Sequence, residues 1–202
     1  DAQESCTVPV RGARPRWRNP SLGTDPVGGG GRVGGRGPVV LDLATSAMAG
    51  KKARSAGNEG RAIPPGCAVD AEGNPTTDPR WLMEEPRGAL LAFGGHKGAG
   101  LSLICSLLGA ALTGGETESH QIPPRQGIIN NMLSIIFDPA RLGAGENYAQ
   151  EVIAQLDWMQ HDQQGHDVLL PGEPEARAYQ QRLAEGIHVD EVSWKQFEAL
   201  VL

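Results

Sequence analysis

The pattern of apolar and polar positions predicts several short strands separated by helices. Val39–Ala44 is a short apolar run rich in β-branched residues, which is typical of a strand, and Ala89–Phe93 has the same character. Met132–Phe137 is apolar at all but one position and predicts a buried strand. Val168–Leu170 predicts a further short strand before a Pro-Gly turn.

Helical patterns follow most of these predicted strands. Thr45–Gly60 fits a helix with Thr45 or Ser46 as its N-cap. Leu101–Leu112 is apolar on all sides, which predicts a helix buried against its neighbours and ended by the glycines that follow. Three more helices are predicted: Glu146–Met159, Glu175–Glu185, and a last one capped by Asp190 that contains Val192, Trp194 and Phe197. Strands that alternate with helices indicate a mixed α and β fold.

Two stretches lack this periodicity. Asp1–Pro38 is rich in Arg, Gly and Pro, and eight of the fifteen residues from Gly23 to Gly37 are glycine. Glycine lowers β-propensity and contributes no core volume, so we expect this segment to be loop or poorly ordered. Ile63–Pro79 is turn chemistry throughout.

Charge and composition exclude some classes of protein. The net charge of -6 argues against a nucleic-acid-binding or membrane-surface protein. Arg11–Arg18 fits either an RNA-binding arm or a solvated tail, and the lack of an aromatic stacking platform favours the tail. The longest apolar run is too short to cross a bilayer, and no signal peptide is visible. Three cysteines without a paired framework suggest a reducing compartment, so we expect a cytoplasmic chain with no membrane partner.

The glycine loop Gly94–Gly100 (GGHKGAG) lies between a predicted strand and a predicted helix. Backbone N–H groups in such a loop, with the helix N-terminus and Lys97, suit a pyrophosphate. The spacing matches neither GxGxxG nor GxxxxGK[ST], so the pattern leaves phosphate binding and a tight packing turn as alternatives.

Three other segments are candidates for binding. Asp42 ends a predicted buried strand, where its carboxylate either accepts hydrogen bonds from ribose hydroxyls or caps the next helix. Pro171–Pro174 (PGEP) and Gly23–Pro26 (GTDP) are, by themselves, only turns. The five histidines show no metal-ligand spacing with cysteine, so no metal site is predicted.

Taken in order, these segments resemble the malate/L-lactate dehydrogenase family of NAD(P)-dependent 2-hydroxyacid oxidoreductases. The resemblance is carried by GTDP, VVLDLATSAMAGKK, IPPGCAVDAEGNPTTDP, LLAFGGHKGAGLSLICSLLGAALTGG, INNMLSIIFDPARLG, LLPGEPE and GIHVD. The PPGC turn, the GGHKG loop and the LLPGE segment look closest to the hydroxycarboxylate dehydrogenase branch.

The resemblance implies a large mixed, mostly antiparallel sheet flanked by helices, in a non-Rossmann NAD(P)-binding fold that is incomplete at its N-terminus. It implies a homodimer that transfers hydride between NAD or NADP and a small 2-hydroxy or 2-oxo acid. It divides the chain into residues 1–37, a poorly ordered or degenerate segment, and residues 38–202, a cofactor-binding domain with C-terminal helices. The implied cofactor-binding residues are Leu41, Asp42, Leu43, Lys97, Leu170, Pro171, Gly172, Glu173 and Pro174, and Thr24 is the implied substrate-binding residue.

The sequence also departs from the family. The SHG motif, whose histidine serves as general acid/base, is absent, so no catalytic residue is assigned. Without a positioned acid, hydride transfer loses about 10²–10⁴-fold in rate. Three hypotheses follow: the C-terminal portion of a 2-hydroxyacid dehydrogenase, a truncated or degenerate relative with weak cofactor binding and no catalysis, or a module that binds another phosphate ligand.

Overall fold

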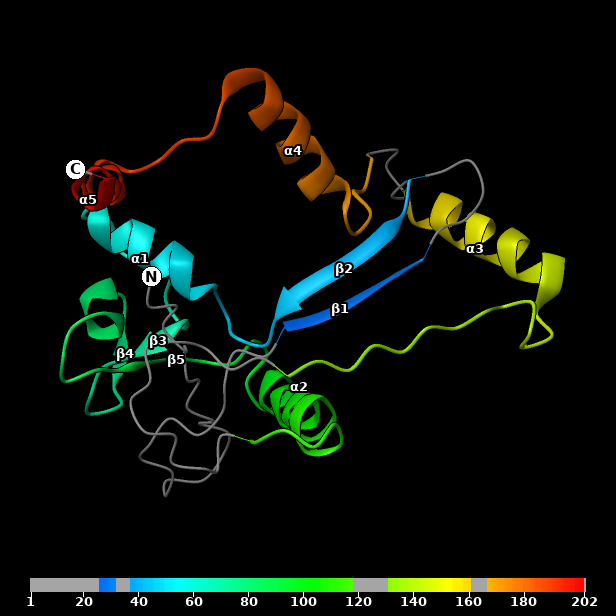
Figure 1. Cartoon of the computed structure of the whole chain (residues 1–202), viewed down its shortest axis with the longest axis horizontal. Coiled ribbons are helices and arrows are strands. Elements are labelled where there is room, and N and C mark those ends of the chain that lie inside the picture. Colours follow the sequence, from blue (N-terminus) through cyan, green and yellow to red (C-terminus); the bar gives the residue numbers. More distant parts are fainter. Residues whose placement is uncertain (1–25, 32–36, 118–130, 161–166, 202) are drawn as a thin grey trace. The chain divides into compact units, whose positions relative to one another are not determined.

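A computed structural model describes residues 26–31, 37–117, 131–160 and 167–201. The chain divides into two compact units. The described parts of unit 1 lie within Asp1–Val27, Ala44–Leu133 and Val189–Leu202, and those of unit 2 within Gly28–Leu43 and Ser134–His188. Helices and strands occur in both units, which confirms the predicted mixed α and β class (Figure 1).

Unit 1 holds a small antiparallel sheet in the order β4-β3-β5. Its strands are β3 (Ala68–Val69), β4 (Pro75–Thr76) and β5 (Ala89–Leu90). The prediction of turns throughout 63–79 was therefore wrong for β3 and β4. Strands of two residues are too short to show a periodic pattern. The turn between β3 and β4 holds them together, and in it the Asn74 backbone N–H donates to Asp70 Oδ1 at 2.7 Å.

A small core fills the space between this sheet and α1 (Gly50–Asn58). Its members are buried apolar side chains from α1, the loop after it, β3 and β5: Ala53, Ala56, Ile63, Ala68 and Leu90. The 3₁₀ turn η1 (Pro79–Leu82) begins at Asp78, whose carboxylate accepts from the Arg80 N–H. Alanines dominate this core, so α1 approaches the sheet closely.

The predicted caps of α1 were wrong. Thr45 is fully buried, and its hydroxyl has no partner among the described residues. The Ser46 hydroxyl donates to the Met48 carbonyl at 2.8 Å instead of capping a helix. Ser46 also bridges to Ala92, so the chain stays extended here and α1 begins only at Gly50.

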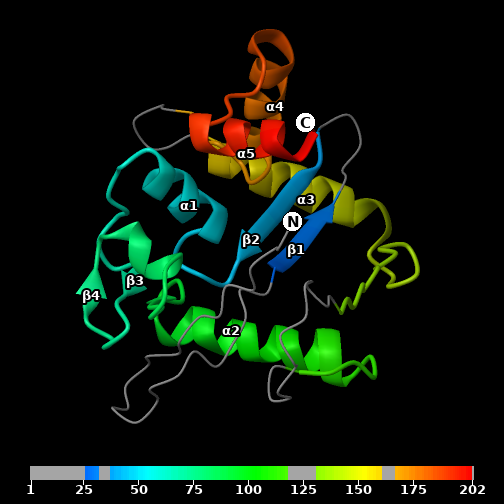
Figure 2. The same ribbon diagram turned by 60° about the vertical axis from the view of Figure 1, so that its left-hand side comes forward.

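The apolar segment predicted as a buried helix forms α2 (His96–Ser106), which continues into the π-helical turn η2 (Leu107–Ala111) without a break (Figure 2). The buried face, however, carries the small residues, among them Gly98, Ala99, Ser102 and Ser106. The branched apolar residues lie on the exposed side: Leu103, Ile104, Leu107, Leu108 and Leu112. The buried face packs closely against neighbouring residues and therefore needs small side chains. Hydropathy alone does not predict which face of such a helix is buried.

The last helix, α5 (Glu191–Val201), confirms the prediction of an Asp190 cap. Asp190 Oδ1 accepts from the Ser193 N–H at 2.9 Å, and Oδ2 accepts from the Ser193 hydroxyl at 2.7 Å. Asn58 Nδ2 donates to the same carboxylate at 3.1 Å, which joins the end of α1 to the start of α5. These hydrogen bonds lower the pKa of Asp190, and the one from the Ser193 backbone N–H has the largest effect.

Most of the two-stranded sheet of β1 (Pro26–Gly31) and β2 (Val39–Ala44) belongs to unit 2 (Figure 1). β2 matches its predicted bounds, whereas β1 falls in the glycine-rich segment predicted as loop. Strand pairing uses backbone groups, so glycine lowers the propensity for a strand without preventing it. At Gly30, a Cβ atom would come within 2.9 Å of the Val39 carbonyl oxygen, so the close approach of β1 to β2 suits glycine.

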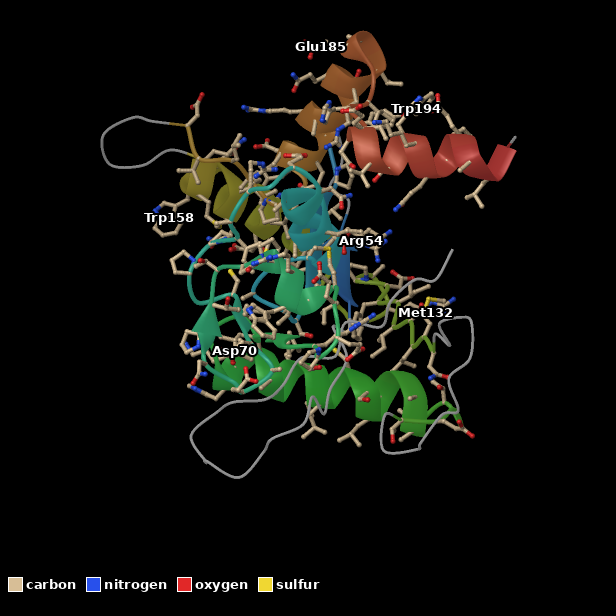
Figure 3. All side chains as sticks on the ribbon, turned by 90° about the vertical axis from the view of Figure 1, so that its left-hand side faces the viewer. Arg54, Asp70, Met132, Trp158, Glu185 and Trp194 are labelled. Atoms are coloured by element: carbon tan, nitrogen blue, oxygen red, sulfur yellow. The ribbon has the colours of Figure 1, made fainter. Side chains whose placement is uncertain are left out.

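Two helices complete unit 2, and both confirm predictions. α3 (Gly145–Gln160) and α4 (Glu173–Glu185) differ from the predicted ranges by one or two residues. The prediction of a strand at 168–170 was wrong, since these residues join no sheet. Instead, the Val168 N–H donates to the Gln160 carbonyl at the end of α3, at 2.7 Å. Trp158 projects from α3 into solvent (Figure 3).

The 132–137 segment departs most from prediction. We expected a buried strand, and the structure shows an extended stretch outside any sheet. Each of its residues is exposed, and its large apolar side chains range from Leu133 at 39% to Ile136 at 92%. No hydrogen bond between described residues involves its backbone.

Candidate functional site

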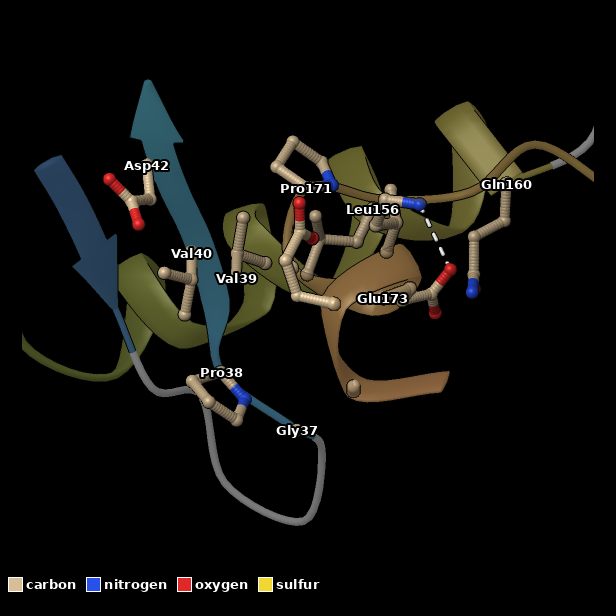
Figure 4. A pocket seen from close by; sticks show the side chains of 13 residues that line it. Gly37, Pro38, Val39, Val40, Asp42, Leu156, Gln160, Pro171 and Glu173 are labelled. Carbon is tan, nitrogen blue, oxygen red and sulfur yellow. Dashed lines mark hydrogen bonds between the residues drawn. The ribbon is translucent and has the colours of Figure 1, made fainter. Parts of the chain in front are cut away.

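A pocket of about 570 Å³ lies wholly within unit 2. Its volume falls within the range of about 300–1,000 Å³ that is usual for ligand pockets. β2, α3 and the turn that starts α4 surround it (Figure 4). The lining residues are Gly37, Pro38, Val39, Val40, Asp42, Leu156, Gln160, Leu170, Pro171, Gly172, Glu173, Glu175 and Ala176.

The turn at 170–173 is fastened to the open edge of β2. The Val40 N–H donates to the Pro171 carbonyl at 3.0 Å. Within the turn, the Glu173 N–H donates to the Leu170 carbonyl, and Glu173 Oε2 accepts from the Leu170 N–H at 2.9 Å (Figure 4). The short PGE motif therefore holds the N-terminus of α4 beside β2.

Gly172 makes this arrangement possible. Its φ is +96°, a left-handed conformation that residues with a side chain rarely adopt. A Cβ atom at this position would lie 3.1 Å from Val40 Cβ and 3.2 Å from the Val40 nitrogen. The motif needs glycine here both for its backbone angle and for its closeness to β2.

The pocket combines apolar walls with a few acidic and amide groups. Val39, Val40, Leu156 and Leu170 give apolar surface, and the last two are buried. The polar side chains are Asp42, Gln160, Glu173 and Glu175, and the described lining contains no Lys, Arg or His. Glu173 already accepts from its own turn. The carboxylates of Asp42 and Glu175 are the acidic groups of the lining that can meet a ligand. Such a set suits hydroxyl and amide groups better than phosphates.

The pocket brings together two of the segments predicted from sequence. Asp42 and residues 170–173 line one space although about 130 positions separate them. Leu41, Leu43 and Pro174 lie on the same elements but are not among the lining residues. Leu156 and Gln160 were not predicted; the helical pattern of α3 placed them on a helix, but nothing in it indicated a neighbouring ligand.

Lys97 belongs to unit 1, at the start of α2, and its side chain is exposed. The N–H groups of Gly95, Lys97, Gly98 and Ala99 all donate to backbone carbonyls in or near the loop. A Cβ atom at Gly98 would come within 2.9 Å of the Thr45 carbonyl oxygen. These contacts favour the packing-turn alternative, because these backbone N–H groups already have acceptors. A ligand of this loop would therefore contact the Lys97 ammonium group.

Three further features concern the predicted substrate contact, metal binding and membrane-spanning helices. Thr24, the predicted substrate-binding residue, lies outside the described residues. The described part of the chain contains no group of three or more His, Cys, Asp or Glu side chains placed to hold a metal ion. None of the helices in the described ranges has the length and hydropathy to cross a membrane.

Comparison with known proteins identifies the family. The model of the malate/L-lactate dehydrogenase family matches residues 3–198. Hydroxycarboxylate dehydrogenase B of Escherichia coli K12 is 42% identical over 163 residues, which are 78% of this chain and 45% of that protein. The Δ1-pyrroline-2-carboxylate/Δ1-piperideine-2-carboxylate reductase of Pseudomonas syringae pv. tomato is 37% identical over 203 residues, covering 97% of this chain and 55% of the reductase.

Solved structures agree with these sequence matches. The crystal structure of Δ1-piperideine-2-carboxylate reductase from Pseudomonas syringae superposes with a TM-score of 0.71 at 34% identity, over 97% of this chain and 57% of that one. Sulfolactate dehydrogenase from Methanocaldococcus jannaschii gives a TM-score of 0.70 at 28% identity. The chain thus spans about half the length of the relatives it matches. Over that span, with nearly every residue matched by the family model, it belongs to the malate/L-lactate dehydrogenase family.

Proposed function

We propose that the chain supplies part of the nicotinamide-cofactor site of a 2-hydroxyacid dehydrogenase. The observation that supports it is the unit 2 pocket, in which the carboxylate of Asp42 and the 170–173 turn meet. The resemblance to the family assigns both segments to cofactor binding, and that assignment does not depend on their proximity in space. The relatives, a hydroxycarboxylate dehydrogenase and cyclic-imine reductases among them, suggest a small 2-hydroxy or 2-oxo acid as substrate.

The residues of the pocket fit the uncharged portion of NAD or NADP. Its walls can cover a flat ring or a sugar, while Asp42 and Glu175 can accept hydrogen bonds from hydroxyl or amide groups. The cofactor, when bound, supplies the hydride that is exchanged with the 2-position of the acid. If the adenosine ribose faces Asp42, the acidic lining favours NAD over NADP, because the 2′-phosphate of NADP would place negative charge beside a carboxylate.

The chain's own residues have separate roles in this proposal. Asp42 orients the ligand by accepting a hydrogen bond, and Val40 and Leu170 exclude water from its apolar side. Gly172 keeps the 170–173 turn close to β2, so that the pocket stays closed on that side. Leu41, Leu43 and Pro174 support these elements, and Lys97 is proposed to bind a phosphate of the cofactor through its side chain.

Catalysis itself needs a proton donor for the alkoxide oxygen, and no residue of this chain is assigned to that step. We therefore propose that the chain contributes binding and positioning, and that turnover requires further residues. Thr24 as a substrate contact, the homodimer and the cytoplasmic location remain predictions.

Titration with NADH and NADPH, followed by nucleotide fluorescence, tests the proposed site. We expect Asp42→Asn to weaken NADH binding about tenfold, because one hydrogen bond to a charged acceptor is weakened. Glu151→Gln is the matched control: it removes an exposed carboxylate from α3, outside the pocket lining, and should leave the affinity unchanged. Equal affinities for the wild type and both variants would refute the pocket assignment. An absence of binding at millimolar nucleotide would favour the degenerate relative instead.

A further inference from the structure

A second pocket, of about 400 Å³, lies within unit 1 and is lined by α1 and the loops on either side of it. Its lining residues all come from one continuous stretch, residues 48–64, so the pocket forms wherever this stretch folds. Two of them, Ala56 and Ile63, belong to the buried core of unit 1 and anchor the pocket to it. The volume is within the range of about 300–1,000 Å³ that is usual for ligand pockets.

The charged side chains of this pocket are all cations. Lys51, Lys52 and Arg61 line it, together with Ser55, and no acidic residue is part of the lining. The chain as a whole has a net charge of -6, so this group of cations runs against the overall balance. The unit 2 pocket has the opposite character, because its lining contains acidic residues and no cation. A hollow lined by charge of one sign concentrates ligands of the other sign, which here are anions.

The two lysines of this pocket have no partner within the described ranges. Neither the Lys51 nor the Lys52 ammonium makes an ion pair or hydrogen bond with another described residue. Arg61 does have one, since its Nε donates to Glu59 Oε2 at 2.6 Å, but a guanidinium has more N–H donors than one oxygen uses. Several other described cations have carboxylate partners: Arg80 with Asp78, Arg87 with Glu85, Arg141 with Asp138, and Lys195 with Glu191.

The position of the two lysines in α1 is electrostatically unfavourable. They lie in the first turn of the helix, which contains no acidic residue and no capping side chain. The N-terminal end of a helix carries partial positive charge, so cations there are disfavoured, and the two ammonium groups also repel each other. Residues that break such a local rule without a structural gain are expected at functional sites. A bound anion would offset both unfavourable interactions.

We propose that this basic pocket binds a small polyanion, a ligand with at least two phosphate or carboxylate groups. Lys51, Lys52 and Arg61 hold these groups through charge-assisted hydrogen bonds. More than one negative charge is needed to balance this set of cations, even with Glu59 beside Arg61. The basic pocket shares no lining residue with the unit 2 pocket, so the proposal does not rest on the proposed function.

Isothermal titration calorimetry of the chain with pyrophosphate, citrate and acetate tests the proposal. We expect pyrophosphate or citrate, or both, to bind at concentrations at which acetate does not, because a single charge gains less from several cations. The affinity should fall as NaCl is added, since these side chains are exposed to solvent. The polyanion that binds more tightly identifies the ligand class as phosphates or as polycarboxylates, and either result supports the pocket.

Single substitutions assign the binding to the pocket. Lys51→Gln and Lys52→Gln should each weaken binding of the polyanion about tenfold, because each removes a charge-assisted hydrogen bond. Lys195→Gln is the matched control: it removes an exposed ammonium group from α5, outside the lining, and should leave the affinity unchanged. In buffer without polyanions, Lys51→Gln and Lys52→Gln should have thermal midpoints equal to or above that of the wild type, because a cation leaves the start of α1.

Two results would overturn the proposal. One is the absence of binding by both pyrophosphate and citrate at millimolar concentration. The other is equal affinity in the wild type, Lys51→Gln and Lys52→Gln, because the anion would then bind elsewhere. Asp42→Asn should not change the affinity for the polyanion, whereas it is expected to weaken NADH binding. Failure of this proposal and failure of the proposed function are therefore distinguishable.

Discussion

At the scale of single residues, backbone geometry decides which positions of the candidate site tolerate change. Gly172 combines a φ of +96° with a close approach to Val40, whereas Gly186, at the end of α4, has a φ of +91° and nothing within 4 Å of the place where its Cβ would be. The two glycines share a positive φ but differ in ψ, which is -21° at Gly172 and 178° at Gly186, and they differ in their surroundings.

Gly172→Ala should destabilise the chain. Left-handed backbone costs a residue with a side chain about 1–3 kcal/mol, and the substitution also adds the contact with Val40. Thermal or urea unfolding of the variant and of the wild type measures the difference. Gly172→Ala should also weaken NADH binding, because the turn must move away from β2. An unfolding midpoint equal to that of the wild type would show that the turn is not packed against β2 as described.

At the scale of elements, the core of unit 1 depends on few side chains. Leu90 is 1% exposed and, with Ile63, is one of the two large side chains in a core otherwise composed of alanines. Neighbouring alanines cannot extend to fill a space that Leu90 leaves.

Leu90→Ala should cost about 2–5 kcal/mol, as is usual for truncation of a buried leucine. Denaturant unfolding measures this change in free energy. The same truncation at Leu183, on the exposed side of α4, should stay within about 0.5 kcal/mol. A comparable loss at both sites would contradict the burial described for β5.

The Asp190 carboxylate links two further elements, the end of α1 and the start of α5. Because its hydrogen bonds lower its pKa in the folded chain, its contribution to stability is present above its ordinary pKa of about 3.9 and is lost as the pH falls through the lowered value. Asp190→Ala should reduce the thermal midpoint at neutral pH by a few degrees, and the difference from wild type should shrink in acid. A midpoint difference that persists unchanged below pH 3 would contradict this role.

At the scale of the whole molecule, the two units differ in how much of their apolar surface is covered. Unit 1 contains its own small core, while unit 2 buries little among its described residues and has exposed side chains at 134–137. The pocket that supports the proposed function lies in unit 2.

We expect the chain alone to show no measurable reduction of 2-oxo acids by NADH. The missing proton donor is worth about 10²–10⁴-fold in rate. Mixing with the complementary half of hydroxycarboxylate dehydrogenase B should restore turnover, followed as the loss of NADH absorbance. Turnover by the chain alone would show that it supplies an acid of its own.

The sequence by itself determined the family, the mixed α and β class, and the position of β2, α3, α4 and α5. These follow from local signals, namely periodicity, the Asp190 cap and the glycine turns, which act over a few residues. It also placed Asp42 and the 170–173 turn among the cofactor-binding candidates, although it gave no reason for them to meet.

Only the tertiary structure decided which side of α2 is buried, that β1 forms from glycines, and that Leu156 and Gln160 share a pocket with Asp42. Each of these depends on what packs against an element, and the residues responsible lie far away in the sequence. The 132–137 segment also shows that burial depends on what packs against an element. Its sequence predicts a buried strand, whereas its backbone makes no hydrogen bond to another residue of the described ranges and its side chains are exposed.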